Sequence, residues 1–202
     1  MDNKAPKVVL LGATSVGKTT LIKKLQTGIF IPDQTPTTSV ESFSKEYTNK
    51  NGEIRKLSLW DTAGQERYDT LSGFYVREAF GVIICFDLTF RKGFEQIEKY
   101  FQKLEDADEH HFCILVGTKY DQIEENPNLR KVTQQEAQKI ASQKKVPYIE
   151  ISSKTDYNIP KFWNKICKLL EKVLQKKMES SLLNIHNITL NNNEVEKKRK
   201  CC

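Results

Sequence analysis

Lys7 to Thr19 read KVVLLGATSVGKT, and this stretch decides the fold. Its first part, Lys7 to Leu11, is a short apolar run that is typical of a buried strand. Its second part, Gly12 to Thr19, matches the pattern GxxxxGK followed by Ser or Thr and opens a helix, which is the setting of a phosphate-binding loop. We therefore expect a strand, a glycine-rich turn and a helix whose N-terminus faces phosphates.

This loop is expected to bind a nucleotide through its backbone N–H groups and a few side chains. Lys18 would pair with the β and γ phosphates, and the Thr19 hydroxyl would coordinate Mg²⁺. The residues predicted to bind the phosphates are Gly12, Thr14, Ser15, Val16, Gly17, Lys18, Thr19 and Thr20. A strand-turn-helix junction without a ligand would not need this lysine beside the glycines, so we favour a phosphate site. The loop does not say which nucleotide it binds.

Outward from the loop, short apolar runs alternate with amphipathic stretches, which predicts an α/β fold. The predicted strands are Lys7 to Leu11, Phe43 to Tyr47, Ile54 to Trp60, Gly81 to Phe86, Phe112 to Gly117 and Pro147 to Ile151. The predicted helices follow Gly17, span Phe94 to Leu104, start at Thr133 with a capping box to Glu136, and run from Pro160 to about Lys177. Asn51-Gly52 predicts a tight hairpin between the second and third strands. We expect a three-layer P-loop NTPase fold: a six-stranded, mostly parallel sheet with one antiparallel strand and helices on both faces.

At 202 residues the chain has room for one globular domain, which we place at residues 1–178. Apolar residues from Phe162 to Leu174 lie on one face of the last helix, as expected for core packing. Ser, Asn, Lys and Glu dominate residues 179–202, so we expect a flexible tail there. The aliphatic residues between Leu182 and Leu190 leave open a short segment that binds a partner.

Composition excludes several classes of protein. The net charge of +6 is interspersed except at Lys197 to Lys200, so nucleic-acid binding is not expected. The apolar run Ala79 to Phe86 is far shorter than the ~18 residues of a spanning helix, and Met1 to Pro6 is too polar for a signal peptide. We therefore expect a cytosolic chain. Five cysteines without a CxxC pair predict neither a disulfide framework nor a zinc site, and Cys85 and Cys113 are expected in the core.

Two further loops indicate a guanine base. Thr118-Lys119-Tyr120-Asp121 directly follows a predicted strand, which places Asp121 at a carboxyl end, where ligands bind in α/β sheets. Its carboxylate can accept from N1–H and the N2 amine of guanine, whereas N1 of adenine is itself an acceptor. Ser152-Ser153-Lys154 follows the last strand, where the Ser153 N–H can donate to guanine O6. In this order, each after a strand, the two loops predict GTP and GDP as ligands.

The segment Trp60 to Glu66, WDTAGQE, supplies the remaining chemistry. Asp61 ends a strand and can hold a Mg²⁺-bound water, the Gly64 N–H can bond the γ-phosphate, and Gln65 can orient the attacking water. Either Asp61 or Gln65 alone would indicate only a solvated loop. Together with the phosphate loop they predict GTP hydrolysis, with Gln65 as the catalytic residue.

In this order the motifs resemble the Ras superfamily of small GTPases over roughly residues 6–175, and most of all its Rab branch. The likeness to Rab proteins is carried by Trp60 to Tyr68, Tyr75, Arg77, Asp87-Leu88-Thr89 and the terminal Cys201-Cys202. The resemblance implies that residues 1–178 are a GTPase domain and that Phe30 covers the guanine face. It also implies that Thr37 binds Mg²⁺ through its hydroxyl and the γ-phosphate through its N–H. The segments around Thr37 and from Asp61 to about Val76 would then be switches ordered by GTP.

The sequence also departs from the family pattern. Thr14 and Ser15 stand where Ras has two glycines, so their side chains would crowd the γ-phosphate and slow hydrolysis. Thr118 replaces the usual asparagine, which predicts a weaker tie between this loop and the phosphate loop. Residues 38–42 follow the Rab pattern only in part, so the sequence does not indicate which effectors bind.

Cys201 and Cys202 predict, by likeness to Rab proteins, a doubly geranylgeranylated C-terminus. Two lipid chains, or one chain with a basic run such as Lys197 to Lys200, hold a protein stably on a bilayer, whereas one chain anchors it reversibly. Two unmodified thiols on a solvated tail are the alternative. The resemblance implies a monomer on the cytoplasmic face of an intracellular membrane, with a cytosolic pool. It also implies an exchange factor, a GTPase-activating protein, a GDP-dissociation inhibitor and effectors as partners.

The expected function is therefore a membrane-anchored switch that hydrolyses GTP and regulates vesicle traffic. Two alternatives stay open: a GTP-binding scaffold with little or no hydrolysis, which Thr14 and Ser15 favour, and a signalling GTPase of the Ras or Rho branch. An ATP-dependent phosphotransferase with the same loop is disfavoured by Asp121 and by the lack of a separate acceptor-binding domain.

Overall fold

The computed structural model describes residues 5–32, 40–61, 76–105 and 111–199, with a six-stranded sheet at the centre. The strands are β1 (Lys7–Leu11), β2 (Glu41–Thr48), β3 (Ile54–Asp61), β4 (Gly81–Asp87), β5 (Phe112–Thr118) and β6 (Tyr148–Glu150). Their order across the sheet is β2-β3-β1-β4-β5-β6. β2 runs antiparallel to β3, and the other neighbouring pairs are parallel. The six predicted strands and the single antiparallel one are confirmed.

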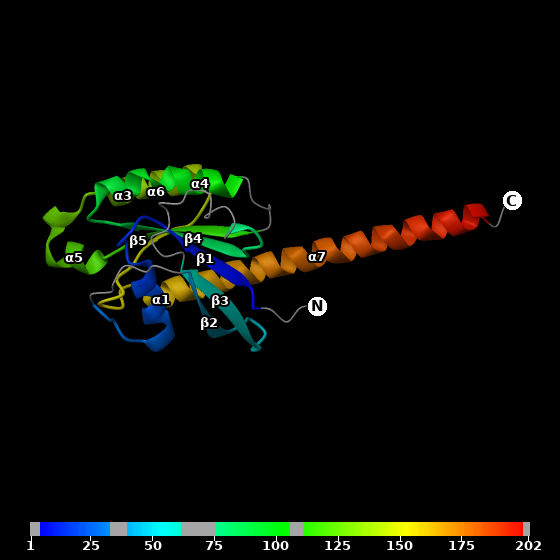
Figure 1. Ribbon diagram of the computed structural model, residues 1–202, viewed down its shortest axis with the longest axis horizontal. Helices are drawn as coiled ribbons and strands as arrows, with labels where there is room; N and C mark the ends of the chain where they lie inside the picture. The colour runs from blue at the N-terminus through cyan, green and yellow to red at the C-terminus, as the bar shows by residue number, and fades with distance from the viewer. Residues whose placement is uncertain (1–4, 33–39, 62–75, 106–110, 200–202) are drawn as a thin grey trace.

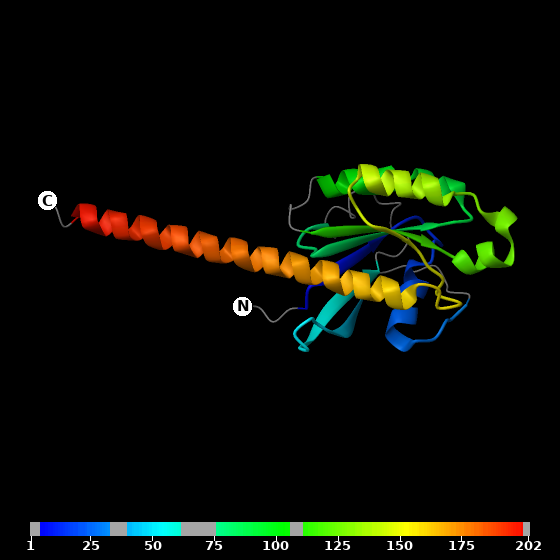
Figure 2. The same ribbon diagram turned by 180° about the vertical axis from the view of Figure 1, so that it is seen from behind.

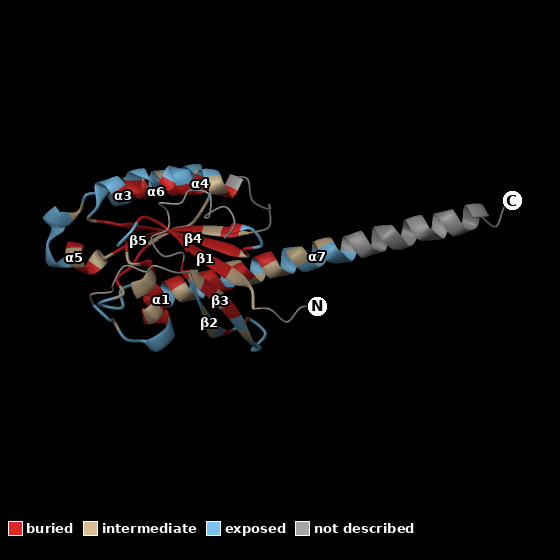
Figure 3. Cartoon of the chain, in the orientation of Figure 1, coloured by how far each residue is buried: buried red, intermediate tan, exposed pale blue. Residues whose placement is uncertain are grey.

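Helices cover both faces of this sheet, which gives the predicted three layers (Figure 1). The helical segments are α1 (Lys18–Thr27), α3 (Arg91–Glu95), α4 (Ile97–Glu105), α5 (Tyr120–Glu125), the 3₁₀ turn η2 (Pro127–Leu129), α6 (Gln134–Gln143) and α7 (Ile159–Arg199). Ile22 of α1 and Phe162 of α7 belong to the core on one face of the sheet. Phe101 of α4 and Ala141 of α6 belong to the core on the other face. Figure 3 shows the buried residues gathered in the strands and on the inner sides of the helices.

The connections of the sheet indicate where a ligand is expected to bind. α1, which follows β1, packs on one face, whereas α3 and α4, which follow β4, pack on the other. Ligands in open α/β sheets bind where neighbouring strands send their connections to opposite faces. β1, β4, β5 and β6 are parallel, so their carboxyl ends lie along one edge of the sheet. The phosphate loop and both predicted base loops follow strands at this edge.

The shorter helices differ in part from the prediction. The sequence predicts one helix over Phe94 to Leu104, but the structure has α3 and α4, separated by Gln96 with φ −84° and ψ −11°. Periodicity does not predict α5 and η2, because helices this short show no repeating apolar face. Thr133 and Glu136 form the predicted capping box at the start of α6. At the hairpin Gly52 has φ +82°, while Asn49 accepts hydrogen bonds from the N–H groups of Asn51 and Glu53.

α7 is longer than predicted. The sequence places its end near Lys177, but the helix continues to Arg199. No glycine or proline stands between Lys161 and Arg199, so no residue of that stretch breaks the backbone hydrogen bonding. Met178 and Leu182 are 62% and 64% exposed, and the flexible tail over residues 179–202 stays a prediction. Among the described residues, no helix combines the length and the apolar character needed to cross a membrane.

The cysteines of the described residues are free thiols: Cys85, Cys113 and Cys167. Cys85 is buried in β4 as predicted, and this burial raises the pKa of its thiol to about 12. Cys113 in β5 is only half-buried, because it lines a hollow at the start of that strand. The prediction of a core cysteine is therefore confirmed for Cys85, whereas Cys113 is partly buried and packs against the edge of the core.

Candidate nucleotide-binding site

The loop after β1 is shaped by two glycines in conformations that other residues rarely adopt. Gly12 has φ +146°, and a Cβ atom there would lie 2.2 Å from the carbonyl oxygen of Cys85. Gly17 has φ +93° and directly precedes α1. Glycine takes such conformations without strain. The loop therefore passes close to β4 and presents the N-terminus of α1 at the sheet edge, as phosphate-binding loops do.

Lys18 lies folded against this loop. Its side chain is buried, and its Nζ donates to the carbonyl oxygens of Gly12 at 2.5 Å and Ala13 at 3.0 Å. A buried ammonium group needs such partners, since a charge removed from water is otherwise very costly. The two carbonyl groups thus hold a positive charge within the loop, which fits the predicted pairing of Lys18 with phosphates.

Ser15 carries backbone strain at the outer side of the loop. It has φ +63°, and the left-handed region costs a non-glycine residue about 1 to 3 kcal/mol. Thr14 and Ser15 are both exposed, whereas Val16 is buried in the core. Thr20 is half-buried in the first turn of α1. The crowding of a γ-phosphate by Thr14 and Ser15 stays a prediction.

Two of the predicted metal ligands meet in the structure. Thr19 Oγ1 donates to Asp61 Oδ2 at 2.5 Å, and Asp61 is fully buried at the end of β3. Hydroxyl and carboxylate oxygens are the ligand types that Mg²⁺ prefers, and this ion is commonly held by one or two protein groups together with phosphates and water. The pair therefore fits a Mg²⁺ ion. Thr37, the third predicted ligand, lies outside the described residues.

Thr118 connects the base loop to the phosphate loop. Its hydroxyl oxygen lies 2.6 Å from the Val16 carbonyl oxygen and 2.9 Å from that of Phe86, and the side chain is buried. Because Thr118 stands where the family has asparagine, the sequence predicts a weaker connection between the base loop and the phosphate loop. The structure shows one direct hydrogen bond from Thr118 to the phosphate loop, because a threonine at the end of β5 is long enough to reach Val16, and the weaker connection relative to asparagine stays a prediction.

Asp121 is held by the second base loop. Ser152 Oγ donates to Asp121 Oδ1 at 2.6 Å, and both side chains are buried. Ser152 Oγ in turn accepts from the N–H groups of Lys154 and Thr155, each at 3.1 Å. One hydroxyl group therefore fixes the orientation of the carboxylate and the course of its own loop. The Thr118 to Asp121 loop and the Ser152 to Lys154 loop therefore lie side by side in the structure.

The lysines of the two base loops are fixed by acidic partners. Lys119 has φ +62°, and its Nζ pairs with Asp87 Oδ2 at 2.7 Å. Lys154 pairs with Glu125 at 2.8 Å on the surface, and this carboxylate raises the pKa of Lys154. Ser153, whose N–H is predicted to bind the base, stands between Ser152 and Lys154 and is half-buried.

Sequence reasoning missed a contact that joins the base loops. The rings of Tyr120 and Tyr157 stack with their centroids 4.0 Å apart and their planes 10° apart. A hydrogen bond with Tyr157 raises the pKa of Tyr120. An aromatic residue at the third position of the Thr118 to Asp121 motif was the available signal, but Tyr157 comes much later in the chain and is brought there by the fold.

For several predicted site residues the structure does not test the predicted role. Phe30 is half-buried just beyond the end of α1. Gly64, Gln65, Cys201 and Cys202 lie outside the described residues. Covering of the base by Phe30, orientation of water by Gln65, the γ-phosphate contact of Gly64 and lipidation of the two cysteines stay predictions.

Known proteins are similar in sequence to this chain over most of its length. The family model described as Ras family matches residues 7–172. Ras-related protein RabC of Dictyostelium discoideum is 31% identical over 199 residues, which cover 97% of this chain and 96% of that protein. Ras-related protein Rab-30 of Homo sapiens is 33% identical over 178 residues, or 87% and 85% of the two chains. Ras-related protein SEC4 of Saccharomyces cerevisiae is 34% identical over 178 residues, or 88% and 78%. The chain belongs to the Ras family of small GTPases and, within it, is most like the Rab proteins.

Proposed function

We propose that this protein is a GTP-hydrolysing switch of the Rab type, anchored to an intracellular membrane, that regulates vesicle traffic. The observation that supports guanine binding best is the Asp121 carboxylate, held at 2.6 Å by Ser152 at the sheet edge that also carries the phosphate loop. An oriented carboxylate accepts two hydrogen bonds from guanine and none from N1 of adenine. In this proposal residues 1–178 form the GTPase domain and residues 179–202 the tail.

The proposed binding mode uses groups at three points of the sheet edge. The backbone of residues 12–20 and the Lys18 ammonium hold the phosphates. Asp121 accepts from N1–H and the N2 amine of guanine, and the Ser153 N–H donates to O6. Thr118, Lys119, Ser152 and Lys154 fix these loops through the contacts described above. Phe30 covers the guanine face.

The proposed hydrolysis needs a positioned water rather than a covalent step. When bound, Mg²⁺ supplies charge neutralisation on the β and γ phosphates, and Thr19, Thr37 and Asp61 are the residues proposed to hold it. Gln65 orients the attacking water, and the Gly64 N–H stabilises charge on the γ-phosphate oxygens. Ser15 keeps the loop backbone in its left-handed turn near this point.

Gln65→Leu should abolish most of the unaided hydrolysis, because leucine can neither accept from nor donate to the attacking water. Unaided Ras-type hydrolysis runs on the order of 10⁻⁴ to 10⁻³ s⁻¹, and we expect the variant to fall roughly tenfold below the wild type. Single-turnover hydrolysis of prebound GTP measures this. Gln102→Leu on α4 is the matched control and should hydrolyse GTP like the wild type. Equal rates for Gln65→Leu and wild type would support the alternative of a GTP-binding scaffold.

Membrane residence should require the terminal cysteines. A single lipid chain anchors a protein only reversibly, whereas two chains anchor it stably. With Cys201 and Cys202 both changed to Ser, we expect the protein in the soluble fraction of the cell, and each single variant should show a weaker association that high salt reduces. Membrane fractionation at low and high salt measures this. A double variant that still pellets with membranes at high salt would contradict lipid anchoring.

The remaining partners follow from the same family likeness. We propose that an exchange factor, a GTPase-activating protein, a GDP-dissociation inhibitor and effectors act on this monomeric chain, and that it divides between the cytoplasmic face of a membrane and a cytosolic pool. The Rab-like relatives support these partners as a class and name none of them.

A further inference from the structure

The outer face of α7 carries a straight row of lysines. They are Lys161, Lys165, Lys168, Lys172 and Lys176. With 3.6 residues per turn, these spacings place all of them within roughly 80° of the helix circumference. Each of these lysines is exposed, and none forms an ion pair with another residue of the described part of the chain. The opposite side of α7, with Phe162, Ile166 and Leu170, lies in the core.

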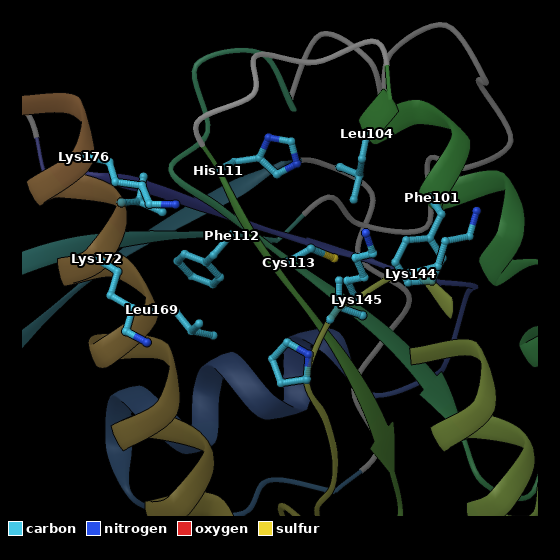
Figure 4. A pocket seen from close by; sticks show the side chains of 13 residues that line it. Phe101, Leu104, His111, Phe112, Cys113, Lys144, Lys145, Leu169, Lys172 and Lys176 are labelled. Atoms are coloured by element: carbon cyan, nitrogen blue, oxygen red, sulfur yellow. The ribbon is translucent and has the colours of Figure 1, made fainter. Parts of the chain in front are cut away.

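The row leads into a hollow of about 520 Å³ at the edge of the sheet where β5 and β6 begin. Figure 4 shows Lys172 and Lys176 of α7 on one side of it and Lys144 and Lys145 on the other. Phe112 and Leu169 contribute apolar side chains to its lining. Lys144 is partly neutralised by Glu98, 2.6 Å away, whereas Lys145 has no acidic partner among the described residues. We call the α7 row together with Lys145 the basic face.

We propose that the basic face lies flat on an anionic lipid bilayer, with its lysines against the phosphate and carboxylate groups of the lipids. This inference rests on the membrane location proposed above and adds which side of the domain meets the bilayer. From Lys161 to Lys176 the row extends over about 22 Å at 1.5 Å per residue, which suits a plane better than a point-like ligand. Positive side chains near an anionic leaflet are attracted to it without any specific contact.

The course of α7 supports a bilayer as the partner of the basic face. Figure 2 shows α7 crossing the near side of the sheet and continuing beyond it toward the C-terminus. If the outer face of α7 lies on the bilayer, the helix axis runs parallel to the membrane. The described end of α7 at Arg199, two residues before the proposed lipid attachment sites Cys201 and Cys202, then also lies along the membrane without a bend in the helix. The carboxyl-end edge of the sheet, with the nucleotide site, lies at the opposite end from the hollow and stays open at the side of the bound domain.

The number of lysines in the α7 row also predicts how much vesicle binding is lost when some of them are removed. Each lysine at an anionic leaflet raises the binding constant about fivefold. Removing three of them should therefore weaken binding by at least tenfold, even if their contributions are not additive. Salt should weaken the wild-type association as well, because surface charges are screened over about 10 Å at moderate ionic strength.

The test uses the full chain without lipid attached, so that the protein surface alone is measured. The variant carries Lys165→Gln, Lys168→Gln and Lys172→Gln, since glutamine keeps helix propensity and removes only the charge. The matched control carries Lys50→Gln, Lys92→Gln and Lys131→Gln, three exposed lysines away from α7 with the same change in net charge. Co-sedimentation is measured with vesicles of phosphatidylcholine alone and of phosphatidylcholine mixed with phosphatidylserine, at low and high salt.

We expect the wild type and the control to bind the phosphatidylserine vesicles at low salt within about threefold of each other, and the α7 variant to bind at least tenfold more weakly. Equal losses in both variants would overturn the proposal, because net charge alone would then explain the binding. Tighter wild-type binding to a DNA duplex than to these vesicles at the same salt, lost in the α7 variant, would also overturn it in favour of a nucleic-acid surface. GDP binding, measured on the same samples, tests the proposed function separately and should be unchanged in both variants.

Discussion

Asp121→Asn should convert a guanine site into a xanthine site. The wild-type carboxylate accepts two charge-assisted hydrogen bonds from guanine, each worth on the order of 1.5 to 3 kcal/mol. Asparagine offers one acceptor and one donor, so it loses the match to the N2 amine of guanine and gains one to the carbonyl that xanthine has in that place. We expect GTP affinity to fall by about 100-fold or more and xanthosine triphosphate to become the preferred ligand.

Competition between the two triphosphates for the purified protein measures this change in preference. The Ser152 hydroxyl, which donates to Asp121 Oδ1 at 2.6 Å, can donate equally to an asparagine oxygen, so the loop should keep its course. The control is Glu124→Gln, which neutralises an exposed carboxylate on the same short helix α5 and should leave the preference for GTP unchanged. An Asp121→Asn protein that prefers GTP by the wild-type margin would show that Asp121 does not read the base.

Lys18→Ala should remove tight nucleotide binding. The Lys18 ammonium is held inside the phosphate loop by the carbonyl oxygens of Gly12 and Ala13. Alanine at this position would leave the phosphates of a bound nucleotide without this cation. Loss of one or two charge-assisted hydrogen bonds corresponds to a release of GDP that is roughly 10 to 10⁴ times faster.

Release of a fluorescent GDP analogue measures this rate. Lys23→Ala on the same helix makes the same change of charge away from the loop and should release GDP like the wild type. Thermal unfolding of both variants checks that each is folded before rates are compared. GDP release from Lys18→Ala at the wild-type rate would contradict the phosphate-loop assignment.

The parts of the fold that sequence predicts well are those with local signals. β1, β4 and β5 are short, largely apolar runs. Gly12, Gly17 and Lys18 identify the phosphate loop because they stand within one stretch of chain. Thr133 and Glu136 likewise form their capping box within one turn. The antiparallel pair is predicted by Asn51-Gly52 between two predicted strands, because a tight turn fixes how its flanking strands pair.

The contacts that sequence does not predict join residues that are distant in the chain. The ion pair between Lys119 and Asp87 and the stack of Tyr120 on Tyr157 depend on which strands lie side by side. The hydrogen bond from Thr118 to Val16 exists because β5 ends beside the phosphate loop. The extension of α7 beyond Lys177 depends on the absence of a helix-breaking residue rather than on any positive signal.

The most direct test of the central claim is the identity of the nucleotide that the purified protein carries. The protein is purified with Mg²⁺ present throughout, denatured in acid, and the released nucleotide is identified by chromatography against standards. Guanine recognition by Asp121 with phosphate binding by the Lys18 loop predicts GDP or GTP, close to one molecule per chain. Release of ADP or ATP, or a protein that carries no nucleotide and takes up no added GDP, would contradict the assignment of this site to guanine nucleotides.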